Sequence, residues 1–376
     1  MNRSTEHRSA PARPAGPRAP SSRGAAPAKA GAALLARDRE ILKAVIATYI
    51  LTAEPVSSRS VARRGGLGLS AATIRNVMAD LEEGGLLAQP HTSAGRIPTA
   101  AGYHLFIESL MRERKVRARD RRYIDENLSG TPPDPERLMA LTTELLTELS
   151  HQVGVMVAPA LGETVLRAVH FVRMSGRKLL CVVVSEAGFV DNKVIETDET
   201  VPREKLVEIS NYLTAQFAGM TLRQIRDRLL VKMSEERAQM DRLMALTIRL
   251  AGEGLAMRDV PELMVGDAAP LLSLPELADV ARVRRLLEAF AEKARLVEML
   301  NRCMSGGGVR VLIGEDADLT SELDFSLVAA PYGFGGETLG AVGIFGPTRM
   351  EYQRLIPLVG YVGATLSRAL GGDKRS

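Results

Sequence analysis

The spacing of apolar residues between positions 36 and 52 predicts a helix. Its apolar side chains recur at the interval of one helix face: Ile41, Leu42, Val45, Ile46, Tyr49 and Ile50. Pro55 follows closely, and the residue before a proline is driven away from the helical conformation. We therefore expect this helix to end near Thr52.

Capping serines mark the two helices that follow. Ser57 or Ser58 can cap a short helix that runs to about Arg64, and Ser70 can cap a third helix. The glycine-rich stretch 65–69 supplies a turn between them. The third helix ends at the glycines 84–85, and its apolar face comprises Ile74, Val77, Met78 and Leu81. A helix, a short helix, a glycine-bearing turn and a helix in this order indicate a helix-turn-helix.

A strand, a polar loop and a return strand are predicted directly after the third helix. Residues 86–89 read as a short strand, and residues 90–96 form a polar loop that contains one arginine, Arg96. Ile97 begins the return strand, and Thr99 can cap a further helix with apolar residues up to Leu110. Two strands joined by a basic loop form a wing, so residues 36–112 are predicted to be a winged helix.

The remainder of the chain alternates between strand-like and helical patterns. Residues 113–135 include all but the first residue of the charge-dense run 112–122 and several prolines, and we expect a linker there. Strand-like runs on both sides of a helical block predict an α+β domain with a helical insertion. We expect strands at 153–157, 165–172, 179–184, 190–196, 309–313, 325–330 and 340–345, and helices at 138–149, 201–256, 275–304 and 350–370.

Six of the 15 methionines lie between Met220 and Met264, within or next to the predicted helical insertion. Methionine suits adaptable apolar surfaces, which favours a surface for association between chains. An ordinary helical core explains the same residues equally well, and the sequence leaves both interpretations open.

The distribution of charge changes this picture in one respect. The net charge is +4, yet residues 1–130 contain 21 basic and 12 acidic side chains, which makes this third basic and the remainder acidic. A basic module joined to an acidic body is typical of proteins that bind a polyanion. Residues 1–35 are rich in Ala, Pro and Arg, and we expect them to be disordered, as a dispensable extension or as a source of nonspecific attraction to phosphate.

Several classes of protein are excluded by what the sequence lacks. No apolar run approaches the ~18 residues of a membrane span, and the first 35 residues have no signal-peptide core, so we expect a soluble cytoplasmic protein. Cys181 and Cys303 show no disulfide or metal-binding spacing. The glycine-rich segment 331–336 fits a tight hairpin better than a nucleotide-binding loop. We expect no catalytic site, no metal and no cofactor.

The first half of the third helix carries residues suited to reading bases. In a helix-turn-helix this part of the recognition helix enters the major groove. Arginine bonds guanine, asparagine bonds adenine, and the methyl groups of Ala and Thr contact thymine. The candidates are Ser70, Ala71, Thr73, Arg75 and Asn76, and the alternative is a merely solvated helix face.

A second group of residues could contact the DNA backbone. Hydroxyl, imidazole and guanidinium groups near a helix N-terminus or in a wing can bond phosphate oxygens. The candidates are Ser57, Ser58, Arg59, His91, Thr92 and Ser93, with Arg96 as a contact to the backbone or the minor groove. The acidic residues at the end of the third helix, Asp80, Glu82 and Glu83, should lie outside the groove.

Several of these segments resemble one bacterial family. The stretches PVSSR at 55–59, LSAATIRN at 69–76, QPHTSAGRIPT at 89–99, VRVLIGE at 309–315, APYG at 330–333 and GPTRM at 346–350 are similar to those of the heat-inducible transcription repressor family, HrcA. The similarity extends over roughly residues 36–370. Residues 1–35 depart from the family pattern.

This resemblance implies a cytoplasmic homodimer with a winged-helix domain and a GAF-like domain. The GAF-like domain would comprise residues 136–200 and 271–370, and residues 201–270 would form an inserted helical dimerisation domain. The resemblance also implies repression through an inverted-repeat operator upstream of chaperone genes, with activity supported by chaperonin. Two alternatives remain, namely a regulator whose GAF-like domain senses a small effector and an enzyme with a DNA-binding domain.

Overall fold

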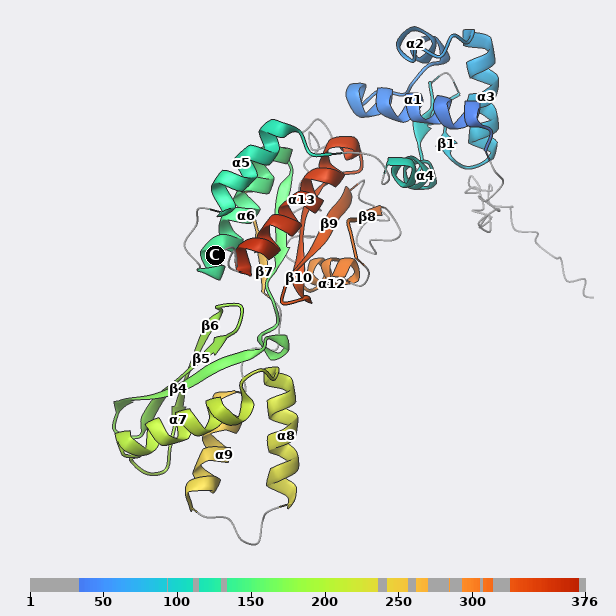
Figure 1. The fold of residues 1–376 in the computed structure, drawn as a ribbon. Coiled ribbons are helices and arrows are strands. Elements are labelled where there is room, and N and C mark those ends of the chain that lie inside the picture. The colour runs from blue at the N-terminus through green and yellow to red at the C-terminus, as the bar shows by residue number, and fades with distance from the viewer. Residues whose placement is uncertain are drawn as a thin grey trace, which may run out of the picture.

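A computed structural model gives the three-dimensional structure of the chain. It describes residues 34–92, 94–110, 115–129, 134–235, 242–255, 262–269, 284, 293–304, 307–313 and 325–371. These residues form three units in Figure 1: a blue N-terminal unit, a central unit that combines green with orange and red segments, and a yellow-green unit that comes between those segments in the chain. The predicted disorder of residues 1–35 falls almost entirely outside the described residues.

The N-terminal unit contains four helices and two very short strands. Their bounds are α1 Ala36–Thr52, α2 Ser58–Arg64, α3 Ala71–Glu83, β1 Leu87–Ala88, β2 Ile97–Pro98 and α4 Ala100–Leu110. The Ser57 side chain accepts a hydrogen bond from the Ser60 amide, and Ser70 accepts one from the Thr73 amide. Thr99 accepts one from the Gly102 amide at the start of α4. The predicted caps are therefore confirmed.

The central unit is built on a five-stranded antiparallel sheet with the order β7-β3-β10-β9-β8. The strands are β3 Val153–Val157, β7 Leu263–Val265, β8 Arg310–Ile313, β9 Phe325–Phe334 and β10 Glu337–Pro347. Gly335 and Gly336 connect β9 to β10, and both have positive φ, as a tight two-residue hairpin requires. The interpretation of this glycine-rich segment as a hairpin is confirmed.

Helices cover both faces of this sheet. They are α6 Pro135–Ser150 and α13 Tyr352–Leu370 on one face and α12 Lys293–Met304 on the other, while α5 Ala118–Ser129 packs against α6 and α13. Alternate residues of β9 point to opposite sides, so Val328 packs with the helices α6 and α13, whereas Leu327 packs with α12. The expected helix 275–304 is described only for its last part, α12, and at the single position Arg284.

Helix α5 corrects the prediction that residues 113–135 are a linker. Ile124 and Leu128 of this helix are fully buried in the same core as α6 and α13. The high charge of residues 112–122 concealed this, because the apolar positions come only in the second half of the helix. The described part of the segment is therefore a structural element of the central unit.

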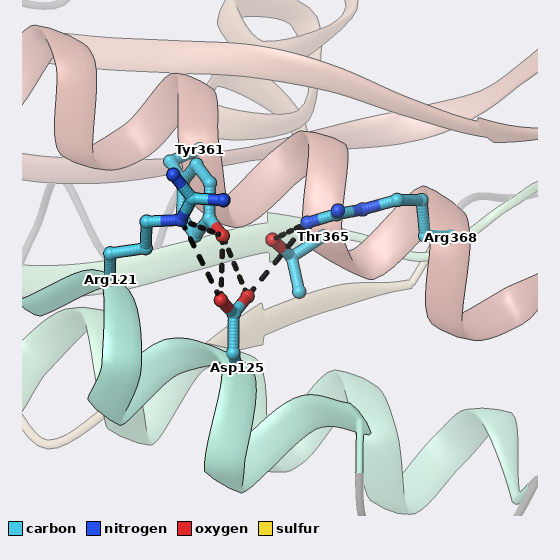
Figure 2. A network of polar contacts seen from close by, with 5 residues as sticks. All are labelled: Arg121, Asp125, Tyr361, Thr365 and Arg368. Carbon is cyan, nitrogen blue, oxygen red and sulfur yellow. Dashed lines mark hydrogen bonds and ion pairs between the residues drawn. The ribbon is translucent and has the colours of Figure 1, made fainter. Parts of the chain in front are cut away.

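A polar network joins α5 to α13 at the surface of the central unit (Figure 2). The Tyr361 hydroxyl donates to both carboxylate oxygens of Asp125, at 2.7 and 2.8 Å. The guanidinium groups of Arg121 and Arg368 each lie 3.8 Å from this carboxylate. They also lie over the Tyr361 ring, at 5.5 and 5.7 Å from its centroid, respectively. This network attaches α5, the first helix after the N-terminal unit, to α13, the C-terminal helix.

The third unit corrects the expected domain boundaries. Strands β4 Leu166–Ser175, β5 Lys178–Ser185 and β6 Val190–Glu196 form a separate three-stranded sheet, and the helices are α7 Arg203–Phe217, α8 Leu222–Glu235 and α9 Arg242–Gly254. The prediction placed these strands with β3, at 136–200. Instead, the buried side chains of this sheet, such as Phe171 and Cys181, share one core with α7, α8 and α9.

The third unit is inserted between two neighbouring strands of the central sheet. β3 and β7 pair with each other, and the Ala158 amide donates to the Glu262 carbonyl at 2.8 Å. The insertion therefore comprises residues 159–261, and it is a mixed α+β unit rather than the helical block that was expected at 201–270. Alternation of apolar residues identified the strands but carried no information on which sheet they join.

Candidate nucleic-acid interface

Helix α3 buries one face and exposes the other. Ile74, Val77, Met78 and Leu81 are buried, in agreement with the predicted apolar face. Arg75 and Asn76 are exposed in the first half of the helix, while Ala71 and Thr73 are half-buried. The Ser70 and Thr73 hydroxyls lie 2.9 Å apart and are hydrogen-bonded to each other at the helix start. The exposed face of α3 thus presents Arg75 and Asn76 to solvent, and Ser70 and Thr73 stabilise the turn that holds them.

The candidates at the start of α2 do not all lie at the surface. The Ser57 hydroxyl is exposed and lies 3.2 Å from the Ser60 amide, which donates to it. Arg59 is exposed as well. Ser58 is buried, with 8% of its surface accessible, so its hydroxyl is poorly placed to bond a ligand in solvent.

The loop between β1 and β2 is held by its own hydrogen bonds. The Gln89 side-chain amide donates to the carbonyls of Thr92 and Ala94, at 3.0 Å each. His91 and Thr92 are exposed, and Ser93 lies outside the described residues. The sequence prediction of a short loop between two strands is confirmed.

Arg96 is connected to both the chain before α2 and the end of α3. Its amide and carbonyl exchange hydrogen bonds with those of Val56, at 2.9 and 2.8 Å, so Val56 adds a third extended segment beside β2. The Arg96 guanidinium forms an ion pair with Glu82, with Nε 2.7 Å from the carboxylate. Sequence reasoning did not identify this pair, although Glu82 precedes the loop closely.

The two cysteines have no features of a reactive site. Both thiols are buried, and burial raises the pKa of Cys181 to about 12 and that of Cys303 to about 11. Near neutral pH these groups are thiols, which are poor nucleophiles and poor metal ligands. Among the described residues no cluster of three or more His, Cys, Asp or Glu side chains could hold a metal ion.

Comparison with known proteins assigns a family to this arrangement. Residues 136–356 match the family model of the HrcA protein C-terminal domain. The heat-inducible transcription repressor HrcA of Geobacter sulfurreducens is 40% identical over 337 residues, which cover 90% of this chain and 98% of the relative. The chain belongs to the HrcA family.

Other HrcA proteins show the same extent of similarity. The repressor of Xanthomonas axonopodis pv. citri is 40% identical over 335 residues, and that of Xylella fastidiosa is 39% identical over 334 residues; each match covers 89% of this chain and 95% of the relative. Membership in HrcA confirms the resemblance described above. Transcription repression is not an enzymatic activity, which agrees with the expectation that the chain is not an enzyme.

One solved structure supports the mixed α+β fold of this HrcA chain. A crystal structure of a protein described only as hypothetical has a TM-score of 0.57 and 25% sequence identity, and the match covers 90% of this chain and 98% of the other. Within the part of the chain that the structure describes, no helix is long and apolar enough to cross a membrane.

Proposed function

We propose that the chain represses chaperone operons by binding an inverted-repeat operator as a homodimer, with residues 36–112 acting as a winged-helix domain. The observation that carries this proposal is the exposure of Arg75 and Asn76 in the first half of a capped helix, next to a two-stranded loop. This half of a recognition helix reaches base edges, and these two side chains can each bond one base bidentately.

Backbone contacts would position α3 on the duplex. The exposed candidates Ser57, Arg59, His91 and Thr92 stand at the start of α2 and in the loop, where they can bond phosphate oxygens. Ser70 and the half-buried Ala71 and Thr73 would approach the same groove from the start of α3. The burial of Ser58 makes it the weakest of these candidates, and Ser93 stays a prediction from the sequence.

The insertion formed by residues 159–261 supplies the surface that we propose for the homodimer. Four large apolar side chains of its three-stranded sheet are more than half exposed: Val172, Met174, Val190 and Val194. Contiguous exposed apolar residues on a sheet favour association with another surface. A dimer would hold two α3 helices at the separation of two half-sites, about 34–36 Å. We therefore propose that the α+β insertion as a whole, rather than its helices alone, mediates dimerisation.

Heat would control repression through the supply of active dimer. In the proposed scheme chaperonin supports the active state, damaged proteins draw chaperonin away on heating, and repression lapses. A modest loss of stability is sufficient for such a switch, because a change of about 1.4 kcal/mol alters the ratio of active to inactive protein tenfold.

Fluorescence anisotropy with a labelled inverted repeat tests this function directly. The purified full-length protein should bind the complete repeat far more tightly than a single half-site, because only the repeat engages both recognition helices. Added chaperonin should raise the fraction of protein that is competent to bind. Equal affinity for the repeat, a half-site and an unrelated duplex of the same length would contradict the proposal.

The ion pair between Arg96 and Glu82 leads to a separate prediction. In Glu82→Gln the guanidinium loses its carboxylate partner and becomes available to phosphate. Each additional phosphate contact steepens the slope of log affinity against log salt by about 0.9. We therefore expect tighter binding at low salt with a slope about one unit steeper.

Glu83→Gln is the matched control for this measurement. Glu83 is exposed and neighbours Glu82, and its substitution removes the same charge. If the two variants shift affinity and slope equally, the change reflects net charge alone, and Arg96 has no separate role.

A further inference from the structure

A cavity of about 380 Å³ lies where the N-terminal unit meets the central unit. This volume is within the range of natural small-molecule sites. Its walls come from the end of α1, from α4, from the segment that enters α5 and from the start of α13. The lining residues are Ala47, Ile50, Leu51, Phe106, Lys115, Val116, Arg117, Asp120, Glu351, Tyr352, Gln353, Arg354 and Pro357.

The cavity adjoins the contacts that fix the N-terminal unit on the central unit. The Arg349 guanidinium donates to the carbonyl of Ile50, at 2.6 Å, across this junction. The rings of Tyr103 in α4 and Tyr352 in α13 pack edge to face, with centroids 5.9 Å apart. A molecule in the cavity would touch elements of both units, so its binding would depend on how α3 is oriented relative to the central sheet.

One side of the cavity is apolar. Ile50, Phe106 and Pro357 contribute hydrocarbon or ring surface, and Ala47 leaves room because its side chain is a single methyl group. Leu51, which also lines the cavity, is 72% exposed and adds hydrocarbon surface at the rim. This wall suits the apolar part of a ligand.

The charges of the lining are unbalanced toward positive. Arg354 lies 3.7 Å from Asp120 and 4.0 Å from Glu351, so one cation serves both acidic residues of the lining. Lys115 and Arg117 are exposed at the mouth and form no ion pair with any described residue. Two cations beside an apolar wall provide the chemistry that recognises an amphipathic anion.

We propose that this cavity binds a small amphipathic organic anion, whose apolar part lies against Ile50 and Phe106 and whose acidic group lies between Lys115 and Arg117. Bound ligand would stabilise one arrangement of the N-terminal unit on the central unit. Binding at the cavity and binding at the operator would then be coupled reciprocally. The coupling rests on the proposed function, whereas binding to the cavity does not.

The binding test uses the full-length protein and the fluorescent anion 8-anilinonaphthalene-1-sulfonate. We expect saturable binding at one site per chain. Arg117→Glu should weaken it at least about tenfold, because a cation beside the acidic group becomes a repelling anion. Ala47→Phe, which fills the apolar side of the cavity, should weaken it similarly. The uncharged analogue N-phenyl-1-naphthylamine should bind more weakly and respond less to Arg117→Glu.

Arg119→Glu is the matched control, since Arg119 is exposed two residues after Arg117, in the first turn of α5, and does not line the cavity. It should leave the affinity for the anion within about twofold of the unchanged protein. Anion affinity that is unaffected by both lining variants, or that falls equally in Arg119→Glu, would overturn the cavity as the binding site.

A second arm measures operator affinity at saturating anion. Coupling between the two sites is supported if the anion changes the affinity for the operator in the unchanged protein and has no such effect in Ala47→Phe. Site-specific anion binding with unchanged operator affinity would overturn the coupling while leaving the cavity site standing. Failure of the protein to bind any operator would count against the proposed function alone, because the first arm contains no DNA.

Discussion

Arg75→Ala is expected to lower the affinity for the inverted-repeat operator by about 10- to 100-fold per recognition helix, as the loss of one bidentate base contact predicts. Arg75 is exposed in the first half of α3, while the buried face of the same helix is left unchanged by the substitution. Anisotropy titrations against the operator and against a duplex with permuted half-sites measure the effect. The ratio of the affinity for the operator to the affinity for the permuted duplex should fall sharply in Arg75→Ala.

Two controls separate base reading from general charge. Arg75→Lys keeps the charge but lacks the planar fork of the guanidinium, so it should retain nonspecific binding while losing discrimination. Arg63→Ala removes an exposed cation at the end of α2 and should weaken binding to both duplexes alike. An Arg75→Ala protein that loses affinity equally for the operator and the permuted duplex would refute base reading by Arg75.

Gly95→Ala is expected to destabilise the N-terminal unit by about 2–4 kcal/mol, since overpacking and two lost hydrogen bonds add together. A methyl group at this position would lie 2.4 Å from the carbonyl oxygen of Val56 and 2.6 Å from that of Pro55. Both are backbone atoms, so the end of the loop at Gly95 and Arg96 would have to move away from Val56. Urea unfolding followed by circular dichroism measures the loss, and operator affinity should fall with it.

Gly252→Ala provides the contrasting substitution. Gly252 lies inside α9, and an added methyl group would meet no atom within 4 Å. Alanine favours a helix over glycine, so this change should leave stability equal or higher by up to about 1 kcal/mol. If Gly95→Ala behaves like Gly252→Ala, the contact between Val56 and Arg96 does not determine the position of the loop.

The N-terminal unit was predictable from sequence because its signals are local. Ser57, Ser70 and Thr99 each precede a helix that they cap, and the four buried residues of α3 follow a strict helical spacing. Glycines 335 and 336 likewise specify a two-residue hairpin through their own backbone preferences. In each case the residues that decide the structure lie within a few positions of one another.

The errors concern contacts between distant parts of the chain. Strands β4–β6 show the alternation of apolar and polar residues that any half-buried strand shows. They form a sheet separate from that of β3 because their buried side chains pack against α7. Ile124 and Leu128 were hidden by the charge of the preceding turn, and their burial requires α13, which lies more than 200 residues later. Pairing between Arg96 and Glu82 likewise depends on how the loop folds back onto α3.

The hydrogen bond from Ala158 to Glu262 has a consequence for how the protein responds to heat. It brings together the two ends of the inserted unit at the adjacent strands β3 and β7, so this strand pair of the central sheet can form whether or not residues 159–261 are folded. The entropy of closing a long loop grows only slowly with its length, so an unfolded insertion adds little cost to this strand pair. The insertion can therefore melt as an independent cooperative unit, and the proposed dimer would then come apart at a lower temperature than the one at which the central unit unfolds.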